Sequence, residues 1–183
     1  MEFDGTLKDL GEVNAHPLID RILGLDREVW SANQYRQNAY SVHEHTESLV
    51  MVFCSGWPDM NVSKEAAWDA LQDLAVPLMH GVLEAHYPPG GTIIRAMAAK
   101  LKPGGIISPH RDTHPSFVAS HRIHVPITTN PGVRFMIDGR PHRFELGHAY
   151  EINNQRNHSV MNSGQDDRIS FIFDYLPRRQ VAA

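Results

Sequence analysis

The second half of the chain is cut into short apolar segments by turn residues, and this pattern limits the fold more than any other feature. Turn signals occur at Pro103-Gly104-Gly105, Asn130-Pro131-Gly132, Asp138-Gly139 and Ser163-Gly164. Short apolar or alternating segments between such clusters are typical of β-strands. The predicted strands cover residues 92–101, 106–107, 121–128, 133–137, 142–144, 149–152, 157–161 and 169–175.

About eight short strands with tight turns favour a mainly β fold, either a double-sheet jelly roll or a barrel. Asp138-Gly139 lies between VRFMI and RPHRF. An Asp-Gly pair between two strand-like segments is a strong signal for a type I′ hairpin.

The first half reads differently, with helical spacing of apolar residues at 16–30 and again at 63–86. Ser63 is a candidate N-cap for the second helix, and Pro77 should kink or split it. Residues 48–53 read as a strand, and His43 and His45 just before it could line a cavity mouth. We therefore expect packed N-terminal helices outside a β-sandwich that the C-terminal half supplies.

The length of 183 residues predicts one domain over 1–183. Within it we expect a mixed support region at 1–90, a β core with the functional site at 91–176, and a tail at 177–183. The hydrophobic fraction of 42% and charged fraction of 21% are those of a globular protein. The longest apolar run, 49–54, is far shorter than a membrane helix requires.

The remaining composition predicts a cytoplasmic protein without a nucleic-acid or membrane partner. The first residues are acidic and polar, unlike a secretory signal, and Cys54 is the one cysteine. A net charge of −4 disfavours a nucleic-acid partner. The sequence does not predict the oligomeric state.

The sequence holds 12 histidines, which directs attention to metal chemistry. His110 and Asp112 stand two residues apart, so an extended backbone turns both to one face while Arg111 points away. His158 is the candidate third ligand, and His148 is its alternative. Two histidines and one carboxylate on one face of an ion leave positions open, which suits non-haem Fe(II).

Three further polar residues lie in apolar strands. Arg168 opens RISFIFDY, where a buried guanidinium needs an anionic partner such as a dicarboxylate. Arg122 and His124 alternate onto one face of HRIHVPI and would add a second polar pair in the same cavity.

Together these motifs resemble the aspartyl/asparaginyl β-hydroxylase family, from about Met97 to Tyr175. The family comprises Fe(II)- and 2-oxoglutarate-dependent oxygenases with a double-stranded β-helix, a cupin-like jelly roll. The resemblance implies iron ligation by His110, Asp112 and His158. It implies that Arg168 holds the distal carboxylate of 2-oxoglutarate, and that Arg122 and His124 fix its metal-binding end.

The chain departs from some family members at two positions. Some bind iron through two histidines alone, whereas this chain keeps Asp112. A hydroxyl residue that helps to hold the distal carboxylate in some members is replaced here by Ala99, so another group makes that contact or it is absent.

The resemblance implies a dioxygenase that hydroxylates an unactivated C–H of an amino-acid-type substrate. This substrate would be an Asp or Asn residue of a polypeptide, or a free amino acid or other small metabolite. The alternatives are a cupin-like metalloenzyme that does not use 2-oxoglutarate and a non-catalytic jelly-roll binding module. Arg168 favours the oxygenase over the first alternative, and the complete set of candidate ligands favours it over the second.

Overall fold

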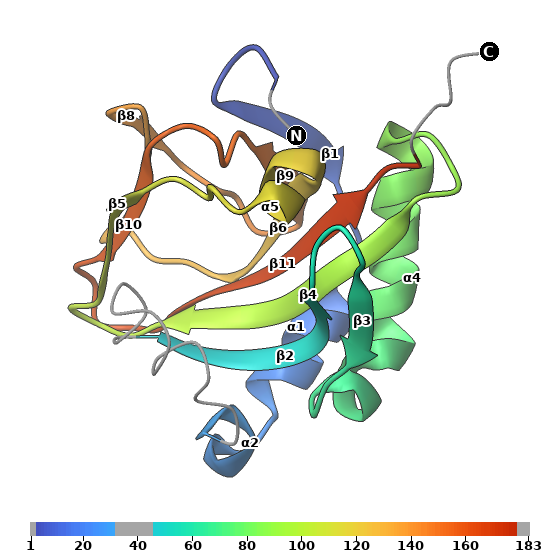
Figure 1. The fold of residues 1–183 in the computed structure, drawn as a ribbon. Helices are drawn as coiled ribbons and strands as arrows, with labels where there is room; N and C mark the ends of the chain where they lie inside the picture. The colour runs from blue at the N-terminus through green and yellow to red at the C-terminus, as the bar shows by residue number, and fades with distance from the viewer. Residues whose placement is uncertain (1–2, 32–45, 179–183) are drawn as a thin grey trace.

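The computed structural model describes residues 3–31 and 46–178, which form two antiparallel sheets and flanking helices (Figure 1). The large sheet has the order β1-β9-β6-β11-β4-β2-β3 and the small sheet β5-β10-β7-β8. The strands are β1 (Leu7–Glu12), β2 (Thr46–Ser55), β3 (Asn61–Lys64), β4 (Thr92–Leu101), β5 (Ile106–His110), β6 (His121–Thr128), β7 (Val133–Ile137), β8 (Arg140–His142), β9 (His148–Ile152), β10 (His158–Asn162) and β11 (Arg168–Leu176). The predicted mainly β jelly roll is confirmed.

The helices α1 (His16–Leu23) and α4 (Trp68–His86) lie against the outer face of the large sheet, opposite the small sheet (Figure 1). Alternate residues of β11 explain this arrangement, because Phe171 and Phe173 join the core under the helices. Ser170, just before Phe171, and Asp174, just after Phe173, lie on the opposite face of β11, toward the small sheet, as the period of two requires.

A second apolar cluster fills the space between the two sheets. Phe135 stacks on Phe144, and Phe144 on Tyr150, with both pairs of ring centroids 4.7 Å apart. The cluster comprises Leu101, Phe135, Ile137, Phe144, Tyr150, Ile152 and Val160. The space between the two sheets is therefore largely a packed apolar core.

The β7–β8 hairpin has the predicted turn. Asp138 and Gly139 both have positive φ, 48° and 73°, as a type I′ turn requires. Ile137 pairs directly with Arg140 across it.

The N-terminal half contributes more to the sheet than expected. The strands β1, β2 and β3 all belong to the large sheet, so the prediction that the C-terminal half alone supplies the sandwich is wrong. The edge strand β1 pairs with β9, and its register shifts between Asp9 and Glu12, where Gly11 has φ 85°.

The predicted helices also need correction. The segment 16–30 divides after Gly24 into α1 and α2 (Arg27–Ser31). Ser63 does not cap a helix, because it pairs with Phe53 in the β2–β3 hairpin. The helix α4 begins at Trp68 and continues through Pro77, which lies on its exposed side, while Ala75 and Met79 keep the buried face packed.

One short helix was not expected. The helix α5 (Pro115–Ala119) begins three residues after the candidate ligand Asp112 and precedes β6. Within the described ranges, no helix is long and apolar enough to cross a membrane.

Candidate metal centre and anion cavity

The structure brings His110, Asp112 and His158 together. Strand pairing explains this, because His110 at the end of β5 stands opposite His158 at the start of β10. One ligand atom from each residue lies within 4.8 Å of the other two, and His110 Nε2 lies 3.8 Å from Asp112 Oδ1. His148 is outside this group and contacts Asp9 at 3.1 Å.

Both histidines are oriented by a backbone carbonyl two residues earlier in the chain. His110 Nδ1 lies 2.8 Å from the Ser108 carbonyl oxygen, and His158 Nδ1 lies 3.0 Å from that of Arg156. A carbonyl can only accept, so each Nδ1 donates and carries the proton, which makes Nε2 the nitrogen able to ligate a metal.

The charges of the group also suit a metal. Burial lowers the pKa of His158 although Asp112 opposes this, so its imidazole is neutral at neutral pH. Burial alone would raise the pKa of Asp112, but the Arg122 charge and the two histidines outweigh it, so the carboxyl group is ionised. Two imidazole nitrogens and one carboxylate oxygen, a ligand set that leaves coordination positions open, match non-haem Fe(II).

Backbone and side-chain contacts fix the loop that carries Asp112. Its N–H donates to the Asn154 carbonyl oxygen over 3.1 Å, and Asn154 Nδ2 donates to Asp112 Oδ2 over 3.3 Å. Gln155 Nε2 donates to the Asp112 carbonyl oxygen over 3.0 Å. The loop after β9 therefore holds the loop after β5.

The structure places Arg122 on two carboxylates. Its Nε and Nη2 donate to Asp174 over 2.8 and 2.9 Å, and its Nη1 donates to Asp112 Oδ2. Arg95 lies on the other side of Asp174, with Nη1 3.5 Å from Oδ2. The guanidinium expected to face a co-substrate thus bridges a candidate metal ligand and a buried aspartate.

His124 is buried between the sheets. Its Nδ1 lies 3.2 Å from Ser170 Oγ, and its Nε2 is buried without a hydrogen bond to any described residue. Burial, together with the charges of Arg168 and Arg122, holds the pKa of His124 well below its ordinary value. A neutral imidazole with an unused buried nitrogen fits a polar ligand that approaches from the interior.

Arg168 is 6% exposed, and within the described part of the chain no carboxylate lies at ion-pair distance from it. Burial lowers its pKa to about 10. The guanidinium lies over Phe135, 5.7 Å from the ring centroid, and the same ring is parallel to that of His158 at 6.5 Å. Phe135 therefore links Arg168 to the candidate metal centre.

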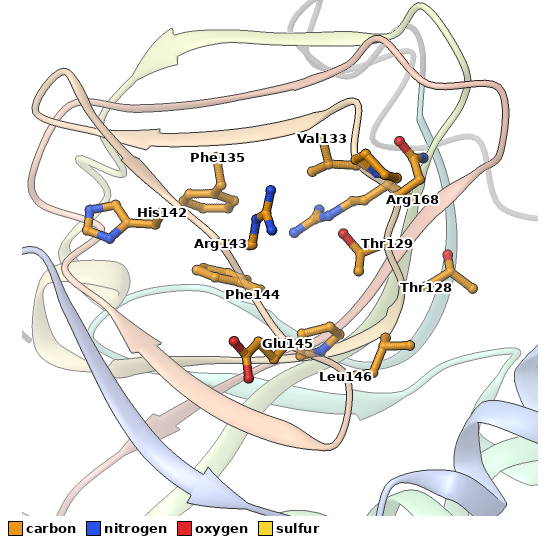
Figure 2. Close-up of a pocket in the computed structure, with 13 residues that line it drawn as sticks. Thr128, Thr129, Val133, Phe135, His142, Arg143, Phe144, Glu145, Leu146 and Arg168 are labelled. Carbon is orange, nitrogen blue, oxygen red and sulfur yellow. The ribbon is translucent and has the colours of Figure 1, made fainter.

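Arg168 lines a cavity of about 420 Å³ between the β6–β7 and β8–β9 connections. In Figure 2 the guanidinium groups of Arg168 and Arg143 converge in this cavity, beside Phe135 and Phe144. Glu145 on the same wall is an acidic member of the lining. The volume lies in the range of small-molecule sites.

Two hydroxyl groups flank Ala99, the position that lacks the hydroxyl expected from the resemblance. Ser48 pairs with Ala99 on one side and Ser170 on the other, and both serines are buried. His43 and His45, considered as cavity-mouth residues, lie outside the described residues.

Sequence reasoning missed Asp174 and Asn154. Asp174 had a usable signal, since it is an acidic residue in the apolar strand RISFIFDY, which also holds the basic Arg168. Asn154 had none, because an asparagine in the loop NNQRN is ordinary.

A group of two histidines and one carboxylate inside a double-stranded β-helix is typical of the class of non-haem Fe(II) oxygenases. The model of the family "Aspartyl/Asparaginyl beta-hydroxylase" matches residues 23–177, and the chain belongs to this family. It is therefore a 2-oxoglutarate-dependent hydroxylase, with Fe(II), 2-oxoglutarate and O₂ as its cofactor and co-substrates. No curated protein matches the chain.

Solved structures share the fold at low sequence identity. A prolyl hydroxylase from Trichoplax adhaerens, in complex with a hypoxia inducible factor peptide fragment, has a TM-score of 0.62 at 11% identity over 94% of this chain and 84% of that one. The nickel complex of the non-haem monooxygenase ThoJ has 0.59 at 11%, over 93% and 73%. The 2-oxoglutarate complex of the Paramecium bursaria Chlorella virus-1 collagen prolyl hydroxylase has 0.56 at 10%, over 96% and 98%.

Proposed function

We propose that His110, Asp112 and His158 hold Fe(II) and that Arg168 holds the distal carboxylate of 2-oxoglutarate. The substrate in this proposal is of the amino-acid type, either an Asp or Asn residue of a polypeptide or a free amino acid or small metabolite. The bound iron supplies oxidative C–H hydroxylation coupled to conversion of the 2-oxo acid to succinate. The protein's own residues set the geometry around it.

The observation that carries the proposal is Arg168. It is buried and lies over a ring that stacks on His158. Keeping a guanidinium in such a place without an anion is costly, so its position favours a carboxylate ligand that spans from Arg168 toward the triad. A bidentate guanidinium–carboxylate contact would then orient the co-substrate.

The other residues around the interior each have a part in the proposal. His124 would donate or accept a hydrogen bond through its unused Nε2, close to the metal-binding end of the co-substrate. Phe135 and Phe144 exclude water between this end and the cavity, which strengthens the charge contacts there. The backbone carbonyls of Ser108 and Arg156, which hold the two Nδ1 atoms, would keep the Nε2 atoms of His110 and His158 available to the bound metal.

The test begins without oxygen. Fe(II) and 2-oxoglutarate added to the protein under nitrogen should give a weak visible charge-transfer band, and His158→Ala should abolish it. A library of amino acids and of Asp- or Asn-containing peptides, followed by succinate release, then identifies the substrate class. Absence of the band in protein that retains Fe(II) would contradict the proposal and favour a cupin-like metalloenzyme that uses no oxo acid.

A further inference from the structure

A row of alternating charges runs inward from the candidate ligand Asp112. The Arg122 guanidinium contacts Asp112 through Nη1 and grips both oxygens of Asp174 through Nε and Nη2. Arg95 follows at 3.5 Å from Asp174, and its Nη2 donates to Ser116 Oγ in α5 over 2.8 Å. The row therefore connects the loop of Asp112 with three strands and a helix.

Strand register explains why the row exists. Asp174 on β11 pairs with Arg122 on β6 and with Arg95 on β4, so the aspartate stands between two arginines of one sheet face. The Phe117 ring of α5 lies under both guanidinium groups, at 4.5 Å from Arg122 and 4.3 Å from Arg95. Asp174 is fully buried, so its contact with Arg122 is shielded from solvent.

The two carboxylate oxygens of Asp112 have different contacts. Oδ2 accepts from Arg122 and from Asn154, whereas Oδ1 lies nearest to the histidine, 3.8 Å from His110 Nε2. A carboxylate held in this way has a fixed side-chain rotamer and can offer one oxygen, Oδ1, to a metal. Without the contacts on Oδ2, the carboxylate could rotate or bind through both oxygens.

We propose that Asp174 is a positioning residue, which holds Arg122 so that Arg122 in turn presents a single oxygen of Asp112 to the metal. The inference rests on the proposed iron site. It assigns a role to Asp174 that does not require contact with metal, co-substrate or substrate. It also gives Arg122 a role in the absence of 2-oxoglutarate, in addition to any contact with the co-substrate.

The test measures metal affinity alone. Metal-free protein is titrated with Mn²⁺ under nitrogen without 2-oxoglutarate, and binding is followed by electron paramagnetic resonance of free Mn²⁺. Replacing partners that orient a metal ligand typically costs roughly 10- to 100-fold in affinity. Asp174→Asn should weaken Mn²⁺ binding by such a factor while the shape of the side chain is kept.

Glu151→Gln is the matched control. Glu151 is also a buried carboxylate of the large sheet, paired with the basic side chains of Lys8 and His121, and no contact with a triad residue is among its described contacts. This variant should bind Mn²⁺ as the wild type does. An equal loss in Glu151→Gln and Asp174→Asn would overturn the proposal, since the effect would then belong to any lost buried charge.

A second variant covers the case in which Asp174→Asn does not fold. Arg122→Lys keeps the positive charge but cannot contact both carboxylates with a planar fork, so it should also lose about tenfold in Mn²⁺ affinity. Wild-type affinity in a folded Asp174→Asn or, failing that, in Arg122→Lys overturns the inference. Wild-type affinity in His158→Ala instead shows that the proposed iron site itself is wrong, so the two failures can be told apart.

Discussion

His110 and His158 stand directly opposite each other in the β5–β10 pair, with their ring centroids 4.3 Å apart and the ring planes inclined by 52°. The register of the small sheet thus sets the distance between two candidate ligands that are far apart in the sequence. Directly after this pair the register shifts, between His158 and Val160. A one-residue slip of β10 would turn His158 away from the interior.

His158→Ala should abolish turnover and weaken metal binding, because one of three candidate ligands is lost. His148→Ala is the comparison, since His148 contacts Asp9 at the sheet edge and should be dispensable for metal binding. Succinate release and bound iron measured on the same preparations decide between them. Retained activity in His158→Ala and lost activity in His148→Ala would reverse the assignment.

Arg168→Ala should raise the concentration of 2-oxoglutarate required for half-maximal rate. Removing one partner of a buried charge pair costs about 2 to 5 kcal/mol, which corresponds to roughly 30-fold or more in affinity. Iron content should be unchanged, because Arg168 is not among the clustered ligand residues. A titration with 2-oxoglutarate at saturating iron measures the effect, and an unchanged requirement would move the anchor to another residue.

Asp112→Gly should lose most hydroxylation, because a charged oxygen donor disappears while both histidines stay in place. The variant also leaves Arg122 with Asp174 as its remaining carboxylate partner among the described residues. Metal analysis and succinate production are measured on one preparation. Substantial hydroxylation with normal iron content would show that Asp112 is not a direct ligand, as in family members with two histidines alone.

Glu151→Gln should reduce the dependence of the free energy of unfolding on pH in the acidic range. Burial alone would raise the pKa of Glu151, but the contacts with His121 and Lys8 outweigh it and leave the pKa below the ordinary 4.5. A lowered pKa means that the ionised carboxylate stabilises the fold fully above pH 4.5 and that this contribution is lost as the pH falls through the lowered value.

At pH 7 the variant should therefore lose about 2 kcal/mol in the free energy of unfolding, the usual scale for hydrogen bonds to a charged group. The gap to the wild type should narrow below pH 4.5. Urea denaturation from pH 7 to pH 3.5 checks both statements, and a gap that stays constant with pH would show that the charge of Glu151 is not responsible.

The strands β4, β6, β7, β9, β10 and β11 could be predicted because turn residues bound them and apolar residues mark their buried faces, whereas the strand expected at 142–144 lies at Arg140–His142. That His110 and Asp112 lie on the same face could also be predicted, from their spacing of two residues on an extended segment. The strand β1 could not be predicted, because LKDLGE has only two leucines among polar residues. It is an edge strand, and none of its residues is fully buried. The prediction that Ser63 caps a helix was wrong, because a serine shortly before an acidic residue can cap a helix or lie in a strand, as Ser63 does in β3.

The contacts of Arg122 could not be predicted from the sequence, because they depend on which strands are neighbours in the sheet. Its alternation with His124 predicts a shared face, and the two do share it. The partner of each side chain, however, depends on which strands become neighbours, and the pairing of β6 with β11 places Asp174 beside Arg122. Such cross-strand partners are separated by 52 residues, so local pattern does not reveal them.

The irregular edge strand β1 has a consequence for how copies of this protein meet. A straight, uncharged edge invites another chain to add a strand to the sheet. Here the shift of register at Gly11 interrupts the regular pairing of the edge strand, and Lys8, Asp9 and Glu12 place charges of both signs along it. Deleting residues 3–12 would bare β9 instead, and the shortened protein should then self-associate edge to edge.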